Sequence, residues 1–279
     1  MSVSNAIGAA AAFLTAAFCI VATVSWGDMH VSPFSPGERL TFQLKWGPIP
    51  AGEAVLEILP VEKLGNQPVY HFVMTVRTNA FLDLFYRYRS RIDAYADIDM
   101  TRSLRYREQT RTRRRKKDVT VEFDWQTKRA HFNRIEKFFR SKSETRKTGR
   151  VTPLLTGTFD PLSVYYYARL LDLHVGDRIE RPISDGLKCT VAEAEVTRRE
   201  SVTANGRAYD TYLVHPDFKG VNPVFEKLAG ANILVWVTAD ARRLPIKLAS
   251  RISLGQFTGE LTAVEGLAGI PPPPENFLK

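Results

Sequence analysis

The chain has 279 residues, with 39 lysines and arginines against 30 aspartates and glutamates, so its formal net charge is +9. Hydrophobic residues make up 44% of the chain and charged residues 25%, an ordinary globular composition that excludes a disordered or fibrous protein. Two cysteines exclude a disulfide scaffold and a zinc site built from four cysteines.

The first 27 residues predict export. Residues 7–24 form an uncharged, apolar run that would be hydrophobic on every side as a helix, and small residues at 23–27 suit a signal cleavage site. Two features favour an uncleaved anchor instead: residues 1–5 lack lysine and arginine, and the run of about 20 residues can span a bilayer. Both alternatives place the remaining chain outside the cytoplasm. We therefore expect a periplasmic or exported protein, anchored by residues 7–26 if the segment is retained.

Alternating polar and apolar residues dominate the chain after an expected linker at residues 28–38. Leu40, Phe42 and Leu44 alternate with polar residues, and later strand signals are separated by turns such as Asn205-Gly206. Further strands are expected near residues 54–58, 69–76, 86–92, 102–110, 118–125, 187–199, 208–215, 233–239, 245–253 and 257–264. We predict a single, mainly β domain over residues 39–266: an antiparallel curved sheet that closes to a barrel or half-barrel, with one or two short helices packed on it.

Two short helices are expected. Asp160-Pro161 suits the N-cap and first position of a helix that continues to Leu170, and a second helix is expected at residues 80–85. Aromatic side chains of these helices are candidates, together with one strand tryptophan, for lining an apolar interior: Phe81, Phe85, Tyr165, Tyr166 and Trp236. The alternative for these rings is ordinary core packing.

The basic excess is local. Residues 101–150 hold 18 lysines and arginines and 6 acidic residues, whereas the rest of the chain holds 21 and 24. We expect a hairpin tip whose cations bind an anionic membrane or glycolipid surface: Arg111, Arg113, Arg114, Arg115, Lys116 and Lys117. One alternative is a solvated tip whose charges discourage edge pairing, and another is nucleic acid, against which export argues.

No motif indicates catalysis. The sequence lacks Gly-x-Ser-x-Gly, His-Glu-x-x-His and a phosphate loop, and its five histidines have no metal-ligand spacing. We therefore expect no enzyme activity, no metal and no cofactor. Cys189 is expected as a small core residue in a strand, the alternative being an intermolecular disulfide. Residues 267–279 are rich in proline and predict a polyproline-like tail.

Three stretches carry a family resemblance: Gly37–Phe42 with Trp46–Ala54, Phe159–Ser163, and Val235–Asp240 followed by Arg243–Lys247. Together they resemble a bacterial envelope family, the domain-of-unknown-function family numbered 3108. The resemblance covers about residues 36–266 and implies an exported, mostly antiparallel β protein without an established activity. The arginine-rich segment 102–117 departs from the family pattern.

Two functional hypotheses follow. In the first, the chain is a non-enzymatic exported cell-envelope protein that binds a lipid or acyl chain in an apolar barrel interior, with a basic rim towards anionic headgroups. In the second, it is a structural or interaction module of envelope or secretion machinery that docks an acidic envelope protein through the basic hairpin. Neither hypothesis depends on an oligomeric state, for which the sequence gives no signal.

Overall fold

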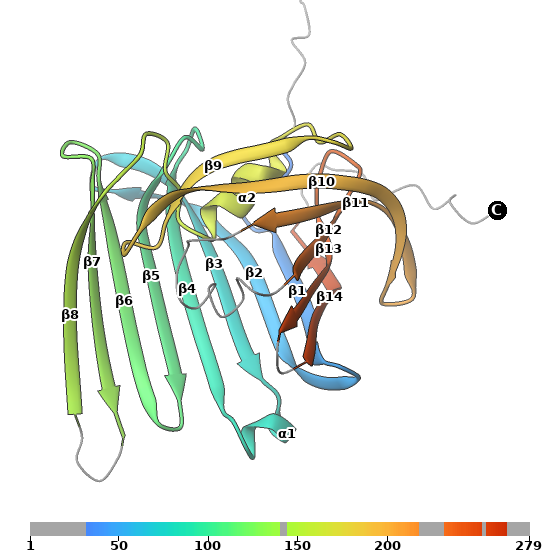
Figure 1. Cartoon of the computed structure of the whole chain (residues 1–279), viewed down its shortest axis with the longest axis horizontal. Helices are drawn as coiled ribbons and strands as arrows, with labels where there is room; N and C mark the ends of the chain where they lie inside the picture. Colours follow the sequence, from blue (N-terminus) through green and yellow to red (C-terminus); the bar gives the residue numbers. More distant parts are fainter. Residues whose placement is uncertain (1–31, 140–143, 218–231, 253–254, 267–279) are drawn as a thin grey trace, which may run out of the picture. The chain divides into compact units, whose positions relative to one another are not determined.

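The computed structural model describes residues 32–139, 144–217, 232–252 and 255–266. The expected signal or anchor at 1–27 and the tail at 267–279 lie outside these residues. The described parts contain two short helices, α1 (Ala80–Asp83) and α2 (Ser163–Arg169), and fourteen strands. The strands, labelled in Figure 1, are β1 (Arg39–Trp46), β2 (Ile49–Leu64), β3 (Gln67–Thr78), β4 (Tyr88–Asp97), β5 (Ser103–Thr112), β6 (Arg115–Asp124), β7 (Arg129–Phe138), β8 (Glu144–Pro153), β9 (Arg178–Ser184), β10 (Cys189–Ala204), β11 (Arg207–Asp217), β12 (Asn232–Thr238), β13 (Pro245–Ile252) and β14 (Gly255–Glu265).

All fourteen strands belong to one antiparallel sheet in the order β8-β7-β6-β5-β4-β3-β2-β1-β14-β13-β12-β11-β10-β9. Within the described residues the sheet ends at β8 and β9, so it is open. The prediction of a mainly β, antiparallel fold with two short helices is confirmed, in an open rather than a closed form. The first and last strands pair in the middle of the sheet, where Leu40 lies beside Val264.

Local turn chemistry explains why neighbouring strands pair. Asn205 and Gly206 both have positive φ, 49° and 74°, which is the backbone of a type I′ hairpin turn. Ala204 and Arg207 pair directly beside them, and the ladder continues along β10 and β11 with one register shift between Val196 and Arg198. The Asn-Gly signal of the sequence therefore fixes the longest hairpin of the C-terminal half.

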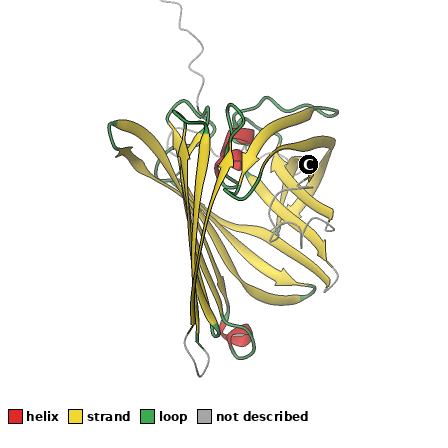
Figure 2. Cartoon of the chain, turned by 60° about the vertical axis from the view of Figure 1, so that its left-hand side comes forward, coloured by secondary structure: helices red, strands yellow, loops and turns green. Residues whose placement is uncertain are grey.

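The turn between β9 and β10 packs against β6 and β7, where Gly186 lies beside Val121 and Phe132. In Figure 2 the strands of the sheet cross one another at an angle. Thr152 at the end of β8 donates its hydroxyl to the carbonyl oxygen of Gly186, 2.8 Å away. Gly186 has a φ of +85°, and a Cβ there would stand 2.8 Å from a methyl carbon of Val121. Glycine is needed at this position because both the backbone angle and the close approach exclude a side chain.

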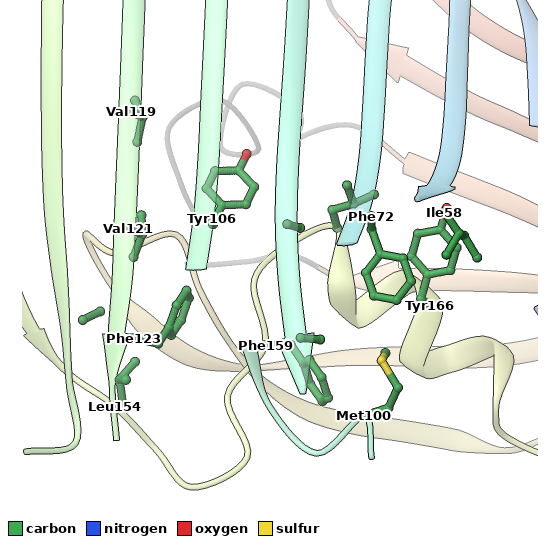
Figure 3. Close-up of a cluster of buried hydrophobic side chains, with 14 of the residues drawn as sticks. Ile58, Phe72, Met100, Tyr106, Val119, Val121, Phe123, Leu154, Phe159 and Tyr166 are labelled. Atoms are coloured by element: carbon green, nitrogen blue, oxygen red, sulfur yellow. The ribbon is translucent and has the colours of Figure 1, made fainter. Parts of the chain in front are cut away.

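The main core lies between α2 and the inner faces of β2–β7 (Figure 3). The Tyr166 ring stacks on Phe72 with 3.9 Å between the ring centroids, and Phe34 packs edge-on against Tyr166 at 5.4 Å. Phe34 is 2% exposed. The expected linker therefore contributes to the core in its described part, because Phe34 fills the space between α2 and β3.

A buried ion pair fixes the position of α2. Arg169 donates to both carboxylate oxygens of Glu38, at 2.5 and 2.9 Å, and each side chain is 1% exposed. Its remaining donors reach the carbonyl oxygens of Pro33, at 2.8 Å, and Arg242, at 3.1 Å. One guanidinium thus joins α2 to the segment before β1 and to the turn between β12 and β13.

Among the residues that the structure describes, no helix combines the length and apolarity needed to cross a membrane.

Candidate functional site

An apolar cavity of ≈ 160 Å³ lies between α2 and the inner faces of β9–β12. Val164, Tyr165 and Ala168 line it from the helix. The other apolar lining residues come from the flanking loops and the strands: Pro161, Leu173, Ile179, Ala192, Ala194, Val214, Pro216, Val235 and Val237. An engineered apolar cavity of about 150 Å³ binds benzene, so this volume suits one ring or the end of an acyl chain.

Local sequence patterns explain why the cavity forms. Asp160 accepts hydrogen bonds from the backbone N–H groups of Leu162 and Ser163, at 2.8 and 2.9 Å, and so holds the turn that leads into α2. The helix begins at Ser163 with Leu162 as its N-cap, two residues later than the sequence predicts. On β10, Ala192 and Ala194 face the helix because strand residues two apart share a face. Their methyl groups leave unfilled the space that larger side chains would occupy.

Three buried polar atoms on residues that line the cavity have no hydrogen-bond partner among the described residues: the Tyr165 hydroxyl and the Nε atoms of Arg181 and Arg243. Burial raises the pKa of Tyr165 well above its usual range, although the nearby Arg169 opposes the shift, so the hydroxyl is a protonated donor. The Arg181 guanidinium lies 4.0 Å from the ring centroid of Tyr167. The cavity therefore combines apolar walls with three buried donors suited to an oxygen acceptor.

The structure separates the five predicted lining residues. Tyr165 lines the cavity, whereas Tyr166 is 0% exposed and belongs to the packed core against Phe72. Trp236 lies on the face of β12 opposite to the lining residue Val235, and its indole N–H donates to Glu200 at 2.7 Å.

Phe81 and Phe85 lie elsewhere, in the connection between β3 and β4, and are 55% and 72% exposed. Figures 1 and 2 both show α1 at one end of the strands and α2 near the other. Phe72, which contacts α2 through Tyr166, precedes Thr78 by six residues, or about 20 Å of extended strand. These two rings therefore belong to a different surface from Tyr165.

The six predicted cations of the basic hairpin are divided between surfaces. Only Arg113 and Arg114 form the turn, since β5 ends at Thr112 and β6 begins at Arg115. Lys117 faces the same side as the core residue Val119 and pairs with Glu108 at 2.6 Å. Arg111 and Lys116 line a groove on the opposite face of the sheet. This hairpin tip is too far from α2 to form the rim of the cavity, because β5 runs its full length between them.

Sequence reasoning missed Arg181, Ala192 and Ala194 as lining residues. The alternation of alanine with glutamate at 192–195 does predict a strand with small residues on one face. The Sγ of Cys189 lies 3.4 Å from the backbone nitrogen of Leu155, which donates to it, and the side chain packs against the main core. Within the described ranges, no three histidine, cysteine, aspartate or glutamate side chains form a metal-binding group.

Comparisons with known proteins give a family but no reaction. A family model described as "Protein of unknown function (DUF3108)" matches residues 41–262. No curated protein matches the chain. Among solved structures, the chain is similar to the crystal structure of a beta-barrel-like protein of domain of unknown function DUF1849 from Brucella abortus. That likeness has 11% sequence identity and a TM-score of 0.44, and it covers 82% of this chain and 97% of the other.

Proposed function

We propose that this chain, which belongs to the DUF3108 family of proteins of unknown function, is a non-enzymatic binding protein of the cell envelope that holds one end of a single acyl chain beneath α2. The observation that carries the proposal is the apolar cavity of ≈ 160 Å³ with the unpartnered Tyr165 hydroxyl at its wall. The cavity volume favours a ligand with a single acyl chain, because the two chains of a diacyl lipid exceed this volume.

The polar groups of the cavity support an acidic head group on the ligand. An unpartnered buried donor costs about 1–3 kcal/mol, which a ligand oxygen recovers on binding. The Tyr165 hydroxyl is such a donor, and the Arg181 guanidinium adds a positive charge without an ion pair among the described residues. A fatty-acid carboxylate therefore suits the site better than an ester or an alkane, since charge-assisted hydrogen bonds are the stronger ones.

The experiment is titration of the full chain with a fluorescent fatty acid, comparing two variants of β10. Ala194→Phe fills the cavity and should weaken binding at least tenfold. Val191→Phe adds the same ring on the opposite, outward face of the strand, where residue 191 is 44% exposed, and should bind as the wild type does. Equal binding by both variants would refute the cavity as the ligand site.

A measurement without a chosen probe complements the titration. Protein purified from its native membrane should carry one co-purifying fatty acid per chain in mass spectrometry of an organic extract. Ala194→Phe should lose this species while its thermal unfolding remains cooperative. Wild-type protein that carries no acyl species would count against the proposal.

A further inference from the structure

The connection between β3 and β4 exposes four apolar side chains close together in sequence. Phe81, Leu84, Phe85 and Tyr86 are 55%, 65%, 72% and 59% exposed. None of the residues of α1 is buried, so the helix presents no apolar face to the core. With about 200 Å² for each aromatic side chain, the four expose on the order of 450 Å². The largest apolar patch of a typical soluble monomer has this size and is often functional.

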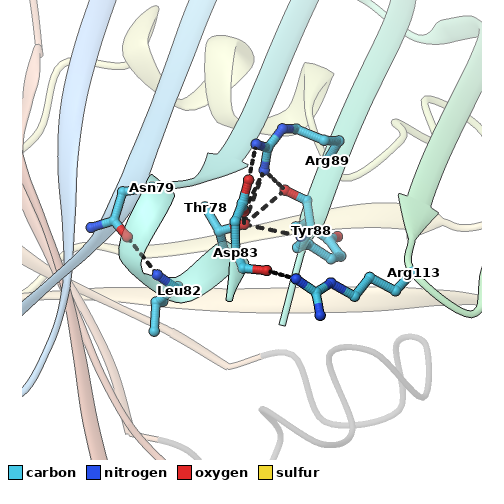
Figure 4. A network of polar contacts seen from close by, with 7 residues as sticks. All are labelled: Thr78, Asn79, Leu82, Asp83, Tyr88, Arg89 and Arg113. Carbon is cyan, nitrogen blue, oxygen red and sulfur yellow. Dashed lines mark hydrogen bonds and ion pairs between the residues drawn. The ribbon is translucent and has the colours of Figure 1, made fainter. Parts of the chain in front are cut away.

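A polar network holds this loop in place, as Figure 4 shows. Asp83 accepts hydrogen bonds from Thr78 at 2.6 Å and from both terminal nitrogens of Arg89 at 3.0 and 2.5 Å. The Asn79 side chain accepts from the backbone N–H of Leu82 at 2.9 Å, and Arg113 donates to the carbonyl oxygen of Asp83. The hydrogen bonds from Arg89 and Thr78 lower the pKa of Asp83, so the network holds at neutral pH.

The network therefore displays the apolar side chains instead of burying them. Burying a phenylalanine or leucine side chain stabilises a folded protein. The hydrogen bonds of this loop instead hold a conformation in which these side chains are exposed. Stability of the chain does not account for a well-ordered loop whose largest side chains face water. An apolar binding partner at this end of the sheet does account for it.

A row of directly opposed cations crosses the outer face of the sheet beside this loop. The register pairs Arg77 with Arg89, Arg89 with Arg111, Arg111 with Lys116, and Lys116 with Lys137 across five strands. Like charges directly opposite in a sheet are destabilising, and this row has four such pairs in succession.

Carboxylates neutralise part of this charge. Arg77 pairs with Glu53 at 3.0 Å, and Lys116 pairs with Asp118 at 3.0 Å. Arg111 and Arg114 have no ion pair within the described residues and are exposed, as is Arg87 next to the apolar patch. The uncompensated cations therefore lie at the end of the sheet where the apolar side chains are displayed.

The neighbouring turn extends the same end of the sheet. Asn79 donates from its side chain to the carbonyl oxygen of Pro50 and from its backbone to that of Ala51. Ile49, at the start of β2 beside this contact, is 43% exposed. The backbone N–H of Phe139 donates to Arg114, and Phe139 is also 43% exposed. Exposed apolar side chains thus lie at neighbouring connections at this end of the sheet, together with exposed arginines.

We propose that this end of the sheet docks on an anionic phospholipid bilayer, with Phe81, Leu84, Phe85 and Tyr86 inserted at the headgroup boundary and the arginines against lipid phosphates. Aromatic rings favour the membrane interface, where apolar and polar surroundings meet, and cations near an anionic leaflet gain about fivefold each in partitioning. The arrangement fits a bilayer because one surface presents both signals that peripheral attachment requires.

The test uses the full chain with a tryptophan as a local probe, so its readout is independent of how residues 1–31 interact with lipid. Phe85→Trp is mixed with vesicles of equal parts phosphatidylglycerol and phosphatidylcholine, with and without brominated acyl chains. We expect a blue shift of the added emission and quenching by bromine. Val175→Trp is the control, because Val175 is also exposed, at 55%, but follows α2 near the other end of the strands, and its emission should not change.

Charge is tested in the same background. In the Phe85→Trp protein, adding both Arg111→Gln and Arg114→Gln should reduce the ratio of membrane-inserted to free protein about 25-fold, roughly fivefold for each cation removed. Unchanged Phe85→Trp emission on anionic vesicles would overturn the proposal and leave an acidic protein as the occupant of this surface. Equal insertion into pure phosphatidylcholine would overturn the electrostatic part of it. Because Phe85 does not line the cavity beneath α2, fatty-acid binding and vesicle docking can fail separately.

Discussion

Replacing Glu38 with glutamine removes the charge that neutralises Arg169 while keeping the size of the side chain. Both groups are 1% exposed, and the carboxylate accepts two hydrogen bonds from the guanidinium. In Glu38→Gln, the amide oxygen can accept one of these bonds, but the amide N–H₂ group faces a cation that has lost its counter-charge. Arg169 keeps its bonds to the carbonyl oxygens of Pro33 and Arg242.

The expected loss in the free energy of unfolding follows from the burial of both side chains. Removing one partner of a buried ion pair costs about 3–5 kcal/mol, because the remaining charge stays desolvated. The two retained carbonyl contacts place the expected loss at the lower end, about 3 kcal/mol. A matched control is Glu57→Gln, since Glu57 pairs with Arg39 on the surface, where their side chains are 23% and 41% exposed. That pair should contribute less than about 1 kcal/mol.

Urea unfolding followed by tryptophan fluorescence gives the free energy of unfolding for both variants. The double variant Glu38→Gln with Arg169→Met should be more stable than Glu38→Gln alone, because methionine removes the unpaired buried charge. A loss for Glu38→Gln no larger than that for Glu57→Gln would refute the view that this ion pair positions α2. So would a double variant that is less stable than the single one.

Three further predictions concern other parts of the chain. Burial raises the pKa of Asp93, but hydrogen bonds from His71 and Arg91 outweigh it and hold that pKa at about 2. Asp93→Asn should therefore cost about 2 kcal/mol at pH 7, and in urea unfolding the difference should fade as the pH falls from about 4 to 2; a constant difference would contradict this. Gly186→Ala should cost about 2–3 kcal/mol in thermal unfolding, through positive φ and overpacking, and an unchanged Tm would contradict it. Tyr165→Phe should raise stability by about 1 kcal/mol and weaken fatty-acid binding about tenfold, and unchanged affinity would contradict the role of the hydroxyl.

The strands were predictable from sequence because each depends on local signals. Alternation along residues 40–46 and 118–124 produces β1 and β6, and Asn205-Gly206 forms a type I′ turn between β10 and β11. Asp160 holds the turn before α2 through two short-range hydrogen bonds. The pairing of β1 with β14 depends on contacts more than 200 residues apart in sequence, which no local pattern encodes.

The candidate site was less predictable because it depends on faces and register. Tyr165 and Tyr166 are adjacent on one helix, yet a rotation of about 100° places one at the cavity and the other in the core. The same one-residue step separates Lys116 from Lys117 on β6, where it places their cations on opposite faces of the sheet. Composition identified the charge and the rings but not which of them share a surface.

The pairing of β1 with β14 also suits the chain to circular permutation. On either side of that ladder, every strand pairs with its neighbours in sequence, so one long-range ladder joins two simple meanders. In a circular permutant, a linker would join β14 to β1, and the new ends would lie between Asn205 and Gly206. This variant would retain every strand pair of the sheet and lose only the turn between β10 and β11. The sheet would then be one series of antiparallel neighbours with edges at β8 and β9, and circular permutation would change where synthesis starts without changing which strands pair.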